Sequence, residues 1–214
     1  MKLLSQCFFL CFILVSSPLW GNDYYEGYLI KKSGERMDGM IEMFYGDDKN
    51  INFKDNEDGD KTKFKSIDLI EIGLYFPENS DTIVYKRYIP ASYTWGKKPR
   101  IEKYEIWAFQ IYNSDQVQGY YSPLVQVMHS RGSIRSWQMF LGFVKVKGQD
   151  YILKVVEQDE GYLDPFNVYD KEMRKSFSNA IKDICPDMVI KIKERKYKRE
   201  EFLTMLSDYS ETCK

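Results

Sequence analysis

The sequence predicts an α+β fold: a mostly antiparallel β-sheet or small barrel over about residues 24–157, followed by a helical segment over about residues 168–213. Aromatic residues make up 16% of the chain, and they favour half-buried sheet. Apolar and polar residues alternate in the first part, whose connections are too short for helical crossovers. From Val168 onward the apolar residues recur every three or four positions, which is typical of amphipathic helices.

The first 21 residues have the three-part layout of a secretory signal peptide. Lys2 gives a positive start, residues 3–15 are uncharged and mostly apolar, and the segment ends in the small residue Gly21. The apolar run of about 13 residues is shorter than the roughly 20 that a membrane-spanning helix needs. We therefore expect a cleaved signal peptide over residues 1–21, with an uncleaved N-terminal anchor or a lipoprotein as alternatives. The mature chain would then be exported, to the periplasm or the cell surface.

A β-rich domain over residues 22–160 is predicted from a series of strands and turns. Ile51 and Phe53 alternate with polar residues, as in a strand with one wet face, and the Asp-Gly step within residues 55–60 predicts a hairpin loop. Residues 89–100 hold two prolines and a glycine and are expected to form an exposed loop. The expected strands cover residues 24–31, 37–45, 50–54, 62–65, 67–74, 81–88, 101–112, 116–129, 133–146 and 151–157.

The helical C-terminal segment, residues 161–214, is predicted from two amphipathic stretches. Met173, Phe177 and Ile181 are four residues apart, so they share one face of a helix. Pro186 ends this helix or opens another, and residues 200–212 form a second clear helix. We expect the segment to pack on the sheet, as part of the same domain or as a separate unit.

The cysteines predict one disulfide. Cys7 and Cys11 lie inside the signal peptide and would leave with it, so only Cys185 and Cys213 remain. Two cysteines in an oxidising compartment are expected to pair, and each of these lies near the end of a predicted helix. A Cys185–Cys213 bridge would join the two helix ends, with residues 187–197 as the returning segment. Free thiols buried in the core are the alternative, and no Cys-x-x-Cys spacing points to a catalytic dithiol.

Charge and hydropathy narrow the classes of partner. The chain carries 31 Lys and Arg against 32 Asp and Glu, and this near neutrality argues against nucleic acid as a partner. No second apolar stretch approaches membrane-spanning length, so we expect no transmembrane span in the mature chain. An envelope protein or a glycan remains as the expected partner, and the oligomeric state stays open.

Two groups of short motifs in this sequence are similar to motifs of a known group of proteins. One lies in residues 27–30, 34–35, 38–41, 51–53 and 66–70, and the other combines Cys185-Pro186 with Tyr209-x-x-x-Cys213. With these motifs the chain resembles a group of uncharacterised exported proteins of Gram-negative bacteria, although Ser210 stands where an asparagine usually follows the tyrosine. The resemblance implies an exported β-sheet domain with a helical tail and carries no catalytic residue across. By fold analogy alone, the order of strands and turns in the first segment is also similar to a small SH3- or Sm-like barrel.

No motif of a standard catalytic class occurs in the sequence. His129 is the only histidine and stands near a predicted hairpin end, where a solvated turn residue is the ordinary explanation. We therefore expect no metal, no cofactor and no catalytic residue, and an exported protein that acts by binding or envelope assembly. The alternative is a carboxylate-based enzyme such as a glycosidase, which needs only two carboxyl groups at a suitable separation, for example among Asp81, Glu102 and Glu105.

Three further segments have both a functional and a structural interpretation. Tyr93 and Trp95 precede two lysines and would suit a glycan or small ligand, or they fold back to cover the sheet. The basic stretch 191–199 would suit anionic lipid headgroups, or it is a solvated helix face or linker. The acidic loop 55–60 departs from the EF-hand spacing and is expected to be a solvated hairpin tip rather than a calcium site.

Overall fold

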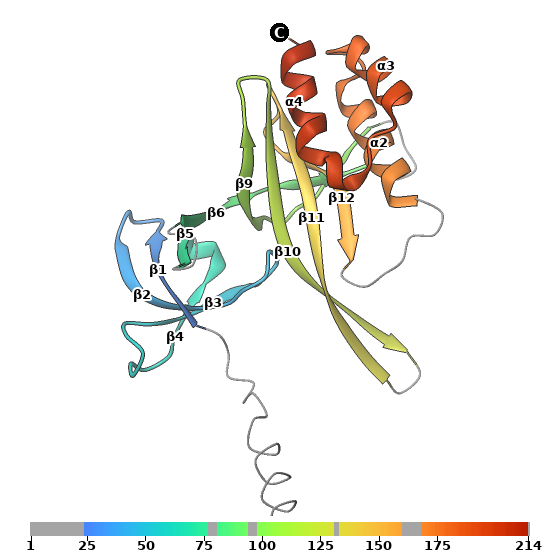
Figure 1. The fold of residues 1–214 in the computed structure, drawn as a ribbon. Coiled ribbons are helices and arrows are strands. Elements are labelled where there is room, and N and C mark those ends of the chain that lie inside the picture. The colour runs from blue at the N-terminus through green and yellow to red at the C-terminus, as the bar shows by residue number, and fades with distance from the viewer. Residues whose placement is uncertain (1–23, 77–80, 94–97, 131–132, 160–167, 214) are drawn as a thin grey trace, which may run out of the picture.

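The computed structural model describes residues 24–76, 81–93, 98–130, 133–159 and 168–213 (Figure 1). The predicted signal peptide, residues 1–21, lies outside this range. Within it, twelve strands form one sheet and three α-helices follow, which confirms the predicted α+β fold.

The strands are β1 Tyr24–Lys31, β2 Arg36–Glu42, β3 Asn50–Lys54, β4 Thr62–Lys65, β5 Leu69–Phe76, β6 Asp81–Tyr88, β7 Pro90–Ser92, β8 Arg100–Ile101, β9 Ile106–Asn113, β10 Val117–Ser130, β11 Ser133–Val146 and β12 Ile152–Asp159. The helices are α2 Val168–Ile181, α3 Pro186–Arg195 and α4 Phe202–Thr212, with short 3₁₀ turns η1 Ser66–Asp68 and η2 Arg199–Glu201.

The strand order is β4-β3-β2-β1-β5-β6-β9-β10-β11-β12-β7-β8. Every described neighbouring pair is antiparallel except β12 and β7, which are parallel. The expectation of an exposed loop at residues 89–100 was wrong for Pro90 and Ala91, which are buried in β7, and residues 94–97 of this range lie outside the described residues. This short apolar segment packs beside the start of β12, where the Ile152 N–H donates to Ile89 O at 3.0 Å.

The first five strands form the predicted series of hairpins. β5 returns to pair with β1, and η1 lies between β4 and β5, so the order β4-β3-β2-β1-β5 closes a compact group at one side of the molecule (Figure 1). We call β1–β6 the N-terminal lobe. Its core is a cluster of aliphatic and aromatic side chains: Leu29, Ile41, Phe44, Ile51, Phe53, Leu69, Ile72, Leu74, Tyr85 and Trp107.

Strand β9 connects this core to the rest of the sheet. Trp107 belongs to the core of the N-terminal lobe, whereas Ile106 and Ala108 on the opposite face pack with Tyr120 and Phe143. Successive side chains of a strand point to opposite faces, so one strand serves two cores. The N-terminal strands are therefore continuous with the larger sheet.

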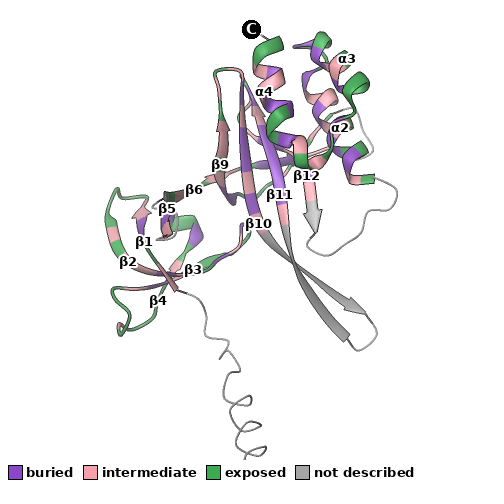
Figure 2. Cartoon of the chain, in the orientation of Figure 1, coloured by how far each residue is buried: buried purple, intermediate pink, exposed green. Residues whose placement is uncertain are grey.

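The three helices cover β10–β12, and we call these six elements the helical lobe (Figure 1). Met173, Phe177 and Ile181 of α2 are fully buried, as the apolar spacing predicts, and the inner helix faces are purple in Figure 2. The sequence left open whether Pro186 ends the first helix or opens another, and the structure has it open helix α3 within the predicted returning segment 187–197. Pro186 opens it, and Met188 and Ile192, four residues apart, give it a buried stripe of its own.

A disulfide joins Cys185 and Cys213, with an S–S distance of 2.01 Å and a Cα–Cα distance of 5.7 Å. Cys185 directly precedes α3 and Cys213 directly follows α4, so the bridge fixes the end of the chain to the junction of α2 and α3. This confirms the predicted pairing and is consistent with an oxidising compartment. In the described part of the chain, no helix is both long enough and apolar enough to cross a membrane.

Candidate binding groove

A groove of about 1130 Å³ lies where the N-terminal lobe meets the segment that connects β8 to β9. We call it the lysine-rimmed groove. The loop after β2, the η1 turn and the ends of β1, β4 and β6 form one side, and the segment before β9 forms the other. Its lining residues are Lys32, Asp47, Asp48, Lys49, Asn50, Lys65, Ser66, Ile67, Arg87, Ile89, Glu102, Lys103, Tyr104, Glu105 and Trp107.

The floor of the groove is a connected set of hydrogen bonds. The buried indole N–H of Trp107 donates to Ser66 Oγ at 3.2 Å, and that hydroxyl donates to the main-chain oxygen of Asp48. Arg87 Nη1 donates to Ser66 O at 3.0 Å, and its guanidinium pairs with Glu105 at 2.8 Å. These hydrogen bonds and the ion pair connect the polar groups of the floor and restrain their positions.

The loop that carries Asp48 is fixed by Gly46. Its N–H donates to Pro123 O at 2.6 Å, and its carbonyl oxygen accepts from the Trp107 N–H at 2.7 Å. A Cβ atom at this position would lie 1.9 Å from Ser122 Oγ, so only glycine allows the loop to approach β9 and β10 so closely.

Asp48 is the most perturbed acidic group of the groove. Burial raises the pKa of its carboxyl above the usual value, although the N–H of Tyr45 donates to Asp48 Oδ2 at 2.7 Å and opposes this shift. The exposed carboxylate of Asp47 beside it adds to the increase.

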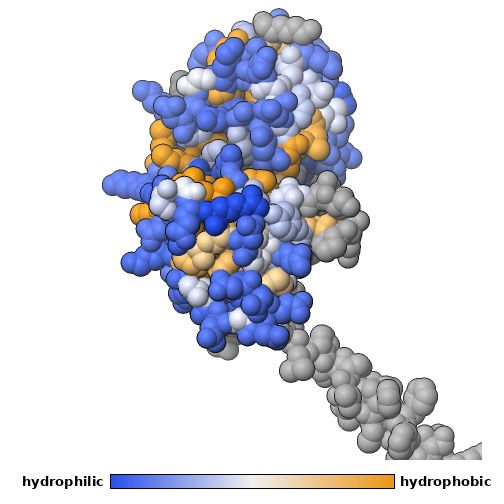
Figure 3. Space-filling view, turned by 90° about the vertical axis from the view of Figure 1, so that its left-hand side faces the viewer, coloured by the Kyte–Doolittle hydropathy of each residue, from blue (hydrophilic) through white to orange (hydrophobic). Residues whose placement is uncertain are grey.

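The rim combines apolar and positively charged side chains. Ile67, Tyr104 and Ile89 are 58%, 56% and 39% exposed, which is unusual for large apolar residues lining one groove. Four exposed lysines also line it: Lys32, Lys49, Lys65 and Lys103. Within the described ranges these four ammonium groups have no acidic side chain within ion-pair distance. Figure 3 shows how apolar patches alternate with hydrophilic ones on one face of the molecule.

Two of the three candidate carboxylates meet in this groove. Glu102 and Glu105 both line it, Glu105 paired with Arg87 at 2.8 Å and Glu102 with Arg100 at 3.6 Å. Asp81 is the first residue of β6, where its main chain pairs with Phe76 of β5. Sequence reasoning missed Asp48, because a single acidic residue in a polar loop carries no pattern.

Tyr93 lies elsewhere, in a second groove between β12 and α2. Its side chain is half-buried, and burial raises the pKa of its hydroxyl. Trp95, the second residue of the predicted ligand site, lies outside the described residues. His129 is in β10 opposite Ile134, one residue from the strand end, so it belongs to a strand and not to the turn itself.

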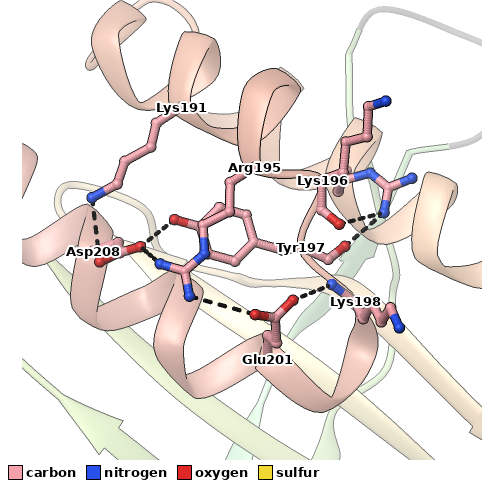
Figure 4. A network of polar contacts seen from close by, with 8 residues as sticks. Lys191, Arg195, Lys196, Tyr197, Lys198, Glu201 and Asp208 are labelled. Atoms are coloured by element: carbon pink, nitrogen blue, oxygen red, sulfur yellow. Dashed lines mark hydrogen bonds and ion pairs between the residues drawn. The ribbon is translucent and has the colours of Figure 1, made fainter.

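The basic stretch 191–199 takes part in a structural network between α3 and α4 (Figure 4). Asp208 of α4 accepts from Lys191 at 3.2 Å, from Arg195 at 2.8 Å and from the Tyr197 hydroxyl. Arg195 also pairs with Glu201, and Arg199 pairs with Asp170 of α2. Three of the six basic side chains are thus already engaged by acids of the helical lobe, which supports the structural interpretation of this stretch.

Comparison of the chain with protein-family models, with curated proteins and with solved structures finds no match. Among the residues that the structure describes, no three His, Cys, Asp or Glu side chains are grouped to hold a metal ion.

Proposed function

We propose that this is an exported, non-catalytic binding protein whose lysine-rimmed groove takes an acidic, partly apolar segment of an envelope protein. The observation that carries the proposal is the combination of exposed Ile67, Ile89 and Tyr104 with four lysines that lack an acidic partner within the described ranges. Exposed apolar side chains in one groove favour a partner that buries them, and the lysines favour a partner with carboxylates.

The fixed floor supports binding as the main activity. Ser66, Arg87 and Trp107 are held by hydrogen bonds to one another, so a partner would meet a preorganised surface and would order few side chains on binding. Glu105 is paired with Arg87 at 2.8 Å, so this carboxylate already has a partner inside the groove. These contacts favour recognition over chemistry.

The compartment is part of the proposal. The layout of residues 1–21 and the Cys185–Cys213 bridge together support export to an oxidising compartment, which we propose to be the periplasm or cell surface of a Gram-negative bacterium. The resemblance to exported proteins with a terminal Tyr-x-x-x-Cys motif supports the same assignment. A partner in that compartment would be another envelope protein.

Site-specific crosslinking in living cells tests the groove. A photoreactive phenylalanine analogue at Ile67 is compared with the same analogue at Ile190 of α3, since these side chains are 58% and 54% exposed. We expect a discrete crosslinked protein from position 67 only, and we expect it to disappear in a Lys49→Glu/Lys65→Glu background. The matched background Lys171→Glu/Lys193→Glu changes the net charge equally, at exposed helix positions, and is expected to keep the adduct.

Two results would contradict the proposal. One is the absence of any adduct at Ile67 in cells that express the folded, oxidised protein. The other is an adduct equally strong in both charge-reversed backgrounds and at high salt, because a partner recognised by exposed lysines is screened by salt.

A carboxylate-based glycosidase is the alternative for the same groove, because Asp48, Glu102 and Glu105 all line it. Burial raises the pKa of the Asp48 carboxyl, as a general acid requires. The purified protein and its Asp48→Asn variant, incubated with an oligosaccharide panel, separate the two functions. Hydrolysis by the wild type that is lost in the variant would establish the enzyme and refute the binding proposal.

A further inference from the structure

The outer edge of β12 is paired only at its beginning. On one side β12 pairs with β11 over most of its length, but on the other side only Ile152 and Leu153 pair with β7. β7 ends at Ser92, which pairs with Arg100 of β8. From Lys154 to Val156, no other described strand lies along this edge, which leaves room for another strand to pair with its main-chain groups.

Helix α2 runs beside this edge and completes the second groove, which has a volume of about 360 Å³. We call it the β12–α2 groove. Tyr169, Glu172, Ser176 and Asn179 line it from the helix, at spacings of three, four and three residues, so they form one stripe. The opposite stripe, which includes Met173 and Phe177, is buried in the core, so α2 holds the groove wall rigidly.

The two ends of the groove are defined. Tyr93 lines it where β7 leaves the sheet, and at the other end Arg199 Nη1 donates to Glu157 O at 3.4 Å. About four edge residues lie between them, which corresponds to a length of roughly 13 Å. That length accommodates a short extended segment and not a folded domain.

Charges in the groove compensate one another. Lys154 and Glu157 pair at 2.9 Å along the edge, and the remaining charged lining residues are Glu172 and Lys175 of α2, one of each sign. A ligand therefore gains little from net charge, unlike at the lysine-rimmed groove. The groups left to recognise it are the main chain of β12 and the small polar side chains Ser176 and Asn179.

We infer that the β12–α2 groove binds an extended, uncharged peptide segment of a partner protein, which adds as a strand to the edge of β12 beneath α2. Main-chain hydrogen bonds from β12 supply the affinity, and the polar stripe of α2 selects small or polar side chains. This site is independent of the lysine-rimmed groove and does not depend on the function proposed for it.

Peptide selection on the oxidised protein tests the inference. A phage library of random linear twelve-residue peptides is the probe, and the selected peptides are measured by fluorescence anisotropy. Ser176→Trp places an indole in the groove, whereas Lys171→Trp places one on an exposed part of the same helix outside it. We expect binding to weaken about tenfold or more in Ser176→Trp and to stay within about twofold in Lys171→Trp.

N-methylation of the peptide main chain tests strand pairing without altering the protein. In an added strand, every second N–H faces the neighbouring strand, so methyl groups at alternate positions remove hydrogen bonds, whereas methyl groups at the intervening positions do not. We expect a loss of about tenfold for one set of positions and little change for the other. This measurement decides the matter even if Ser176→Trp does not fold.

The inference is overturned if no peptide is enriched, or if the enriched peptides bind Ser176→Trp as well as they bind the wild type. It is also overturned if both N-methylated sets bind equally, or if Lys49→Glu/Lys65→Glu abolishes binding, since the peptides would then occupy the lysine-rimmed groove. Binding of chitohexaose that is lost in Tyr93→Ala and Ser176→Trp, with no peptide bound, would assign the groove to glycans instead.

Discussion

Positive charge is used differently in the two lobes. In the helical lobe, Lys191 and Arg195 belong to the basic stretch 191–199, yet both pair with Asp208. In the N-terminal lobe and the segment that meets it, the groove lysines are scattered between positions 32 and 103, and those four lack an acidic partner in the described ranges. A run of basic residues therefore identifies a structural network here, and the candidate site is formed by lysines that only the fold brings together.

The lobes also differ in what stabilises them. The N-terminal lobe relies on packing among aromatic and aliphatic side chains, such as the edge-to-face contact of Phe53 with Phe64 at 5.9 Å. The helical lobe adds a disulfide and an ion-pair network to its apolar core. If the continuous sheet couples the lobes, damage to either one lowers the stability of the whole.

The largest expected effect comes from the core of the N-terminal lobe. Phe53→Ala removes a fully buried ring and is expected to lower the free energy of unfolding by about 3–5 kcal/mol, because it leaves a cavity beside Phe64 and Ile41. Phe177→Ala is the matched change in the helical lobe. Urea unfolding, followed by tyrosine fluorescence and by far-UV circular dichroism, should show one shared transition for both variants. Two separate transitions would mean that the lobes unfold independently.

Removal of the disulfide is expected to have the next largest effect. Cys185→Ser/Cys213→Ser opens a loop with a sequence separation of 28 residues. In the chain-entropy model this lowers the free energy of unfolding by roughly 3.5 kcal/mol. Chemical denaturation of the double variant, with the reduced wild type as control, measures the effect. A loss that appears only in helix-sensitive signals would show that the bridge stabilises the helical lobe alone.

The ion-pair network gives a smaller, pH-dependent effect. Burial alone would raise the pKa of Asp208, but the Tyr197 hydroxyl, Lys191 and Arg195 outweigh it and lower the pKa below 3.8. The network therefore stabilises the fold above pH 3.8, and this contribution is lost as the pH falls through the lowered folded-state pKa. Asp208→Asn should cost about 1–2 kcal/mol at pH 7, and the difference from wild type should shrink at lower pH.

Denaturation curves at several pH values check this prediction. Glu211→Gln is the control, since Glu211 is an exposed carboxylate on the same helix and has no ion pair within the described ranges. An Asp208→Asn effect that is constant from pH 7 to pH 3 would show that the charge of Asp208 contributes nothing.

Local patterns in the sequence predicted the regular elements well. The alternation around Ile51 and Phe53 and the spacing of Met173 and Phe177 report directly which face is buried, and both elements lie where expected. β7 was missed because Pro90-Ala91-Ser92 is too short to show a period, and its partner β12 is about 60 residues further along the chain. α3 was left open as an alternative, because its buried stripe of Met188 and Ile192 is short and the apolar residue Ile190 is exposed instead of adding to it.

The candidate site was harder to predict, for the same physical reason. Trp107 and Ser66 meet through a single hydrogen bond across 41 residues of sequence, and no local pattern reports such a contact. Glu102 and Glu105 were named as possible carboxylates, but their pairing with Arg100 and Arg87 depends on how β6 and β8 are placed. The disulfide was predictable because only two cysteines remain once the predicted signal peptide, residues 1–21, is set aside.

The smallest expected effect on stability distinguishes a lysine of the lysine-rimmed groove from a lysine of the ion-pair network. Lys49→Met is expected to change the free energy of unfolding by less than about 0.5 kcal/mol, because the exposed ammonium group has no ion-pair partner among the residues that the structure describes. Lys191→Met, by contrast, is expected to lower the free energy of unfolding by about 0.5–1 kcal/mol, because it removes the contact with Asp208 at 3.2 Å. Parallel urea titrations measure the stability of both variants, and Lys191→Met should be the less stable. In the crosslinking assay the Lys49→Met variant should have the larger effect, because only this variant is expected to reduce the yield of the crosslinked product. If Lys49→Met lowers the free energy of unfolding more than Lys191→Met does, Lys49 stabilises the fold itself. That result would contradict the binding role proposed for Lys49 in the lysine-rimmed groove.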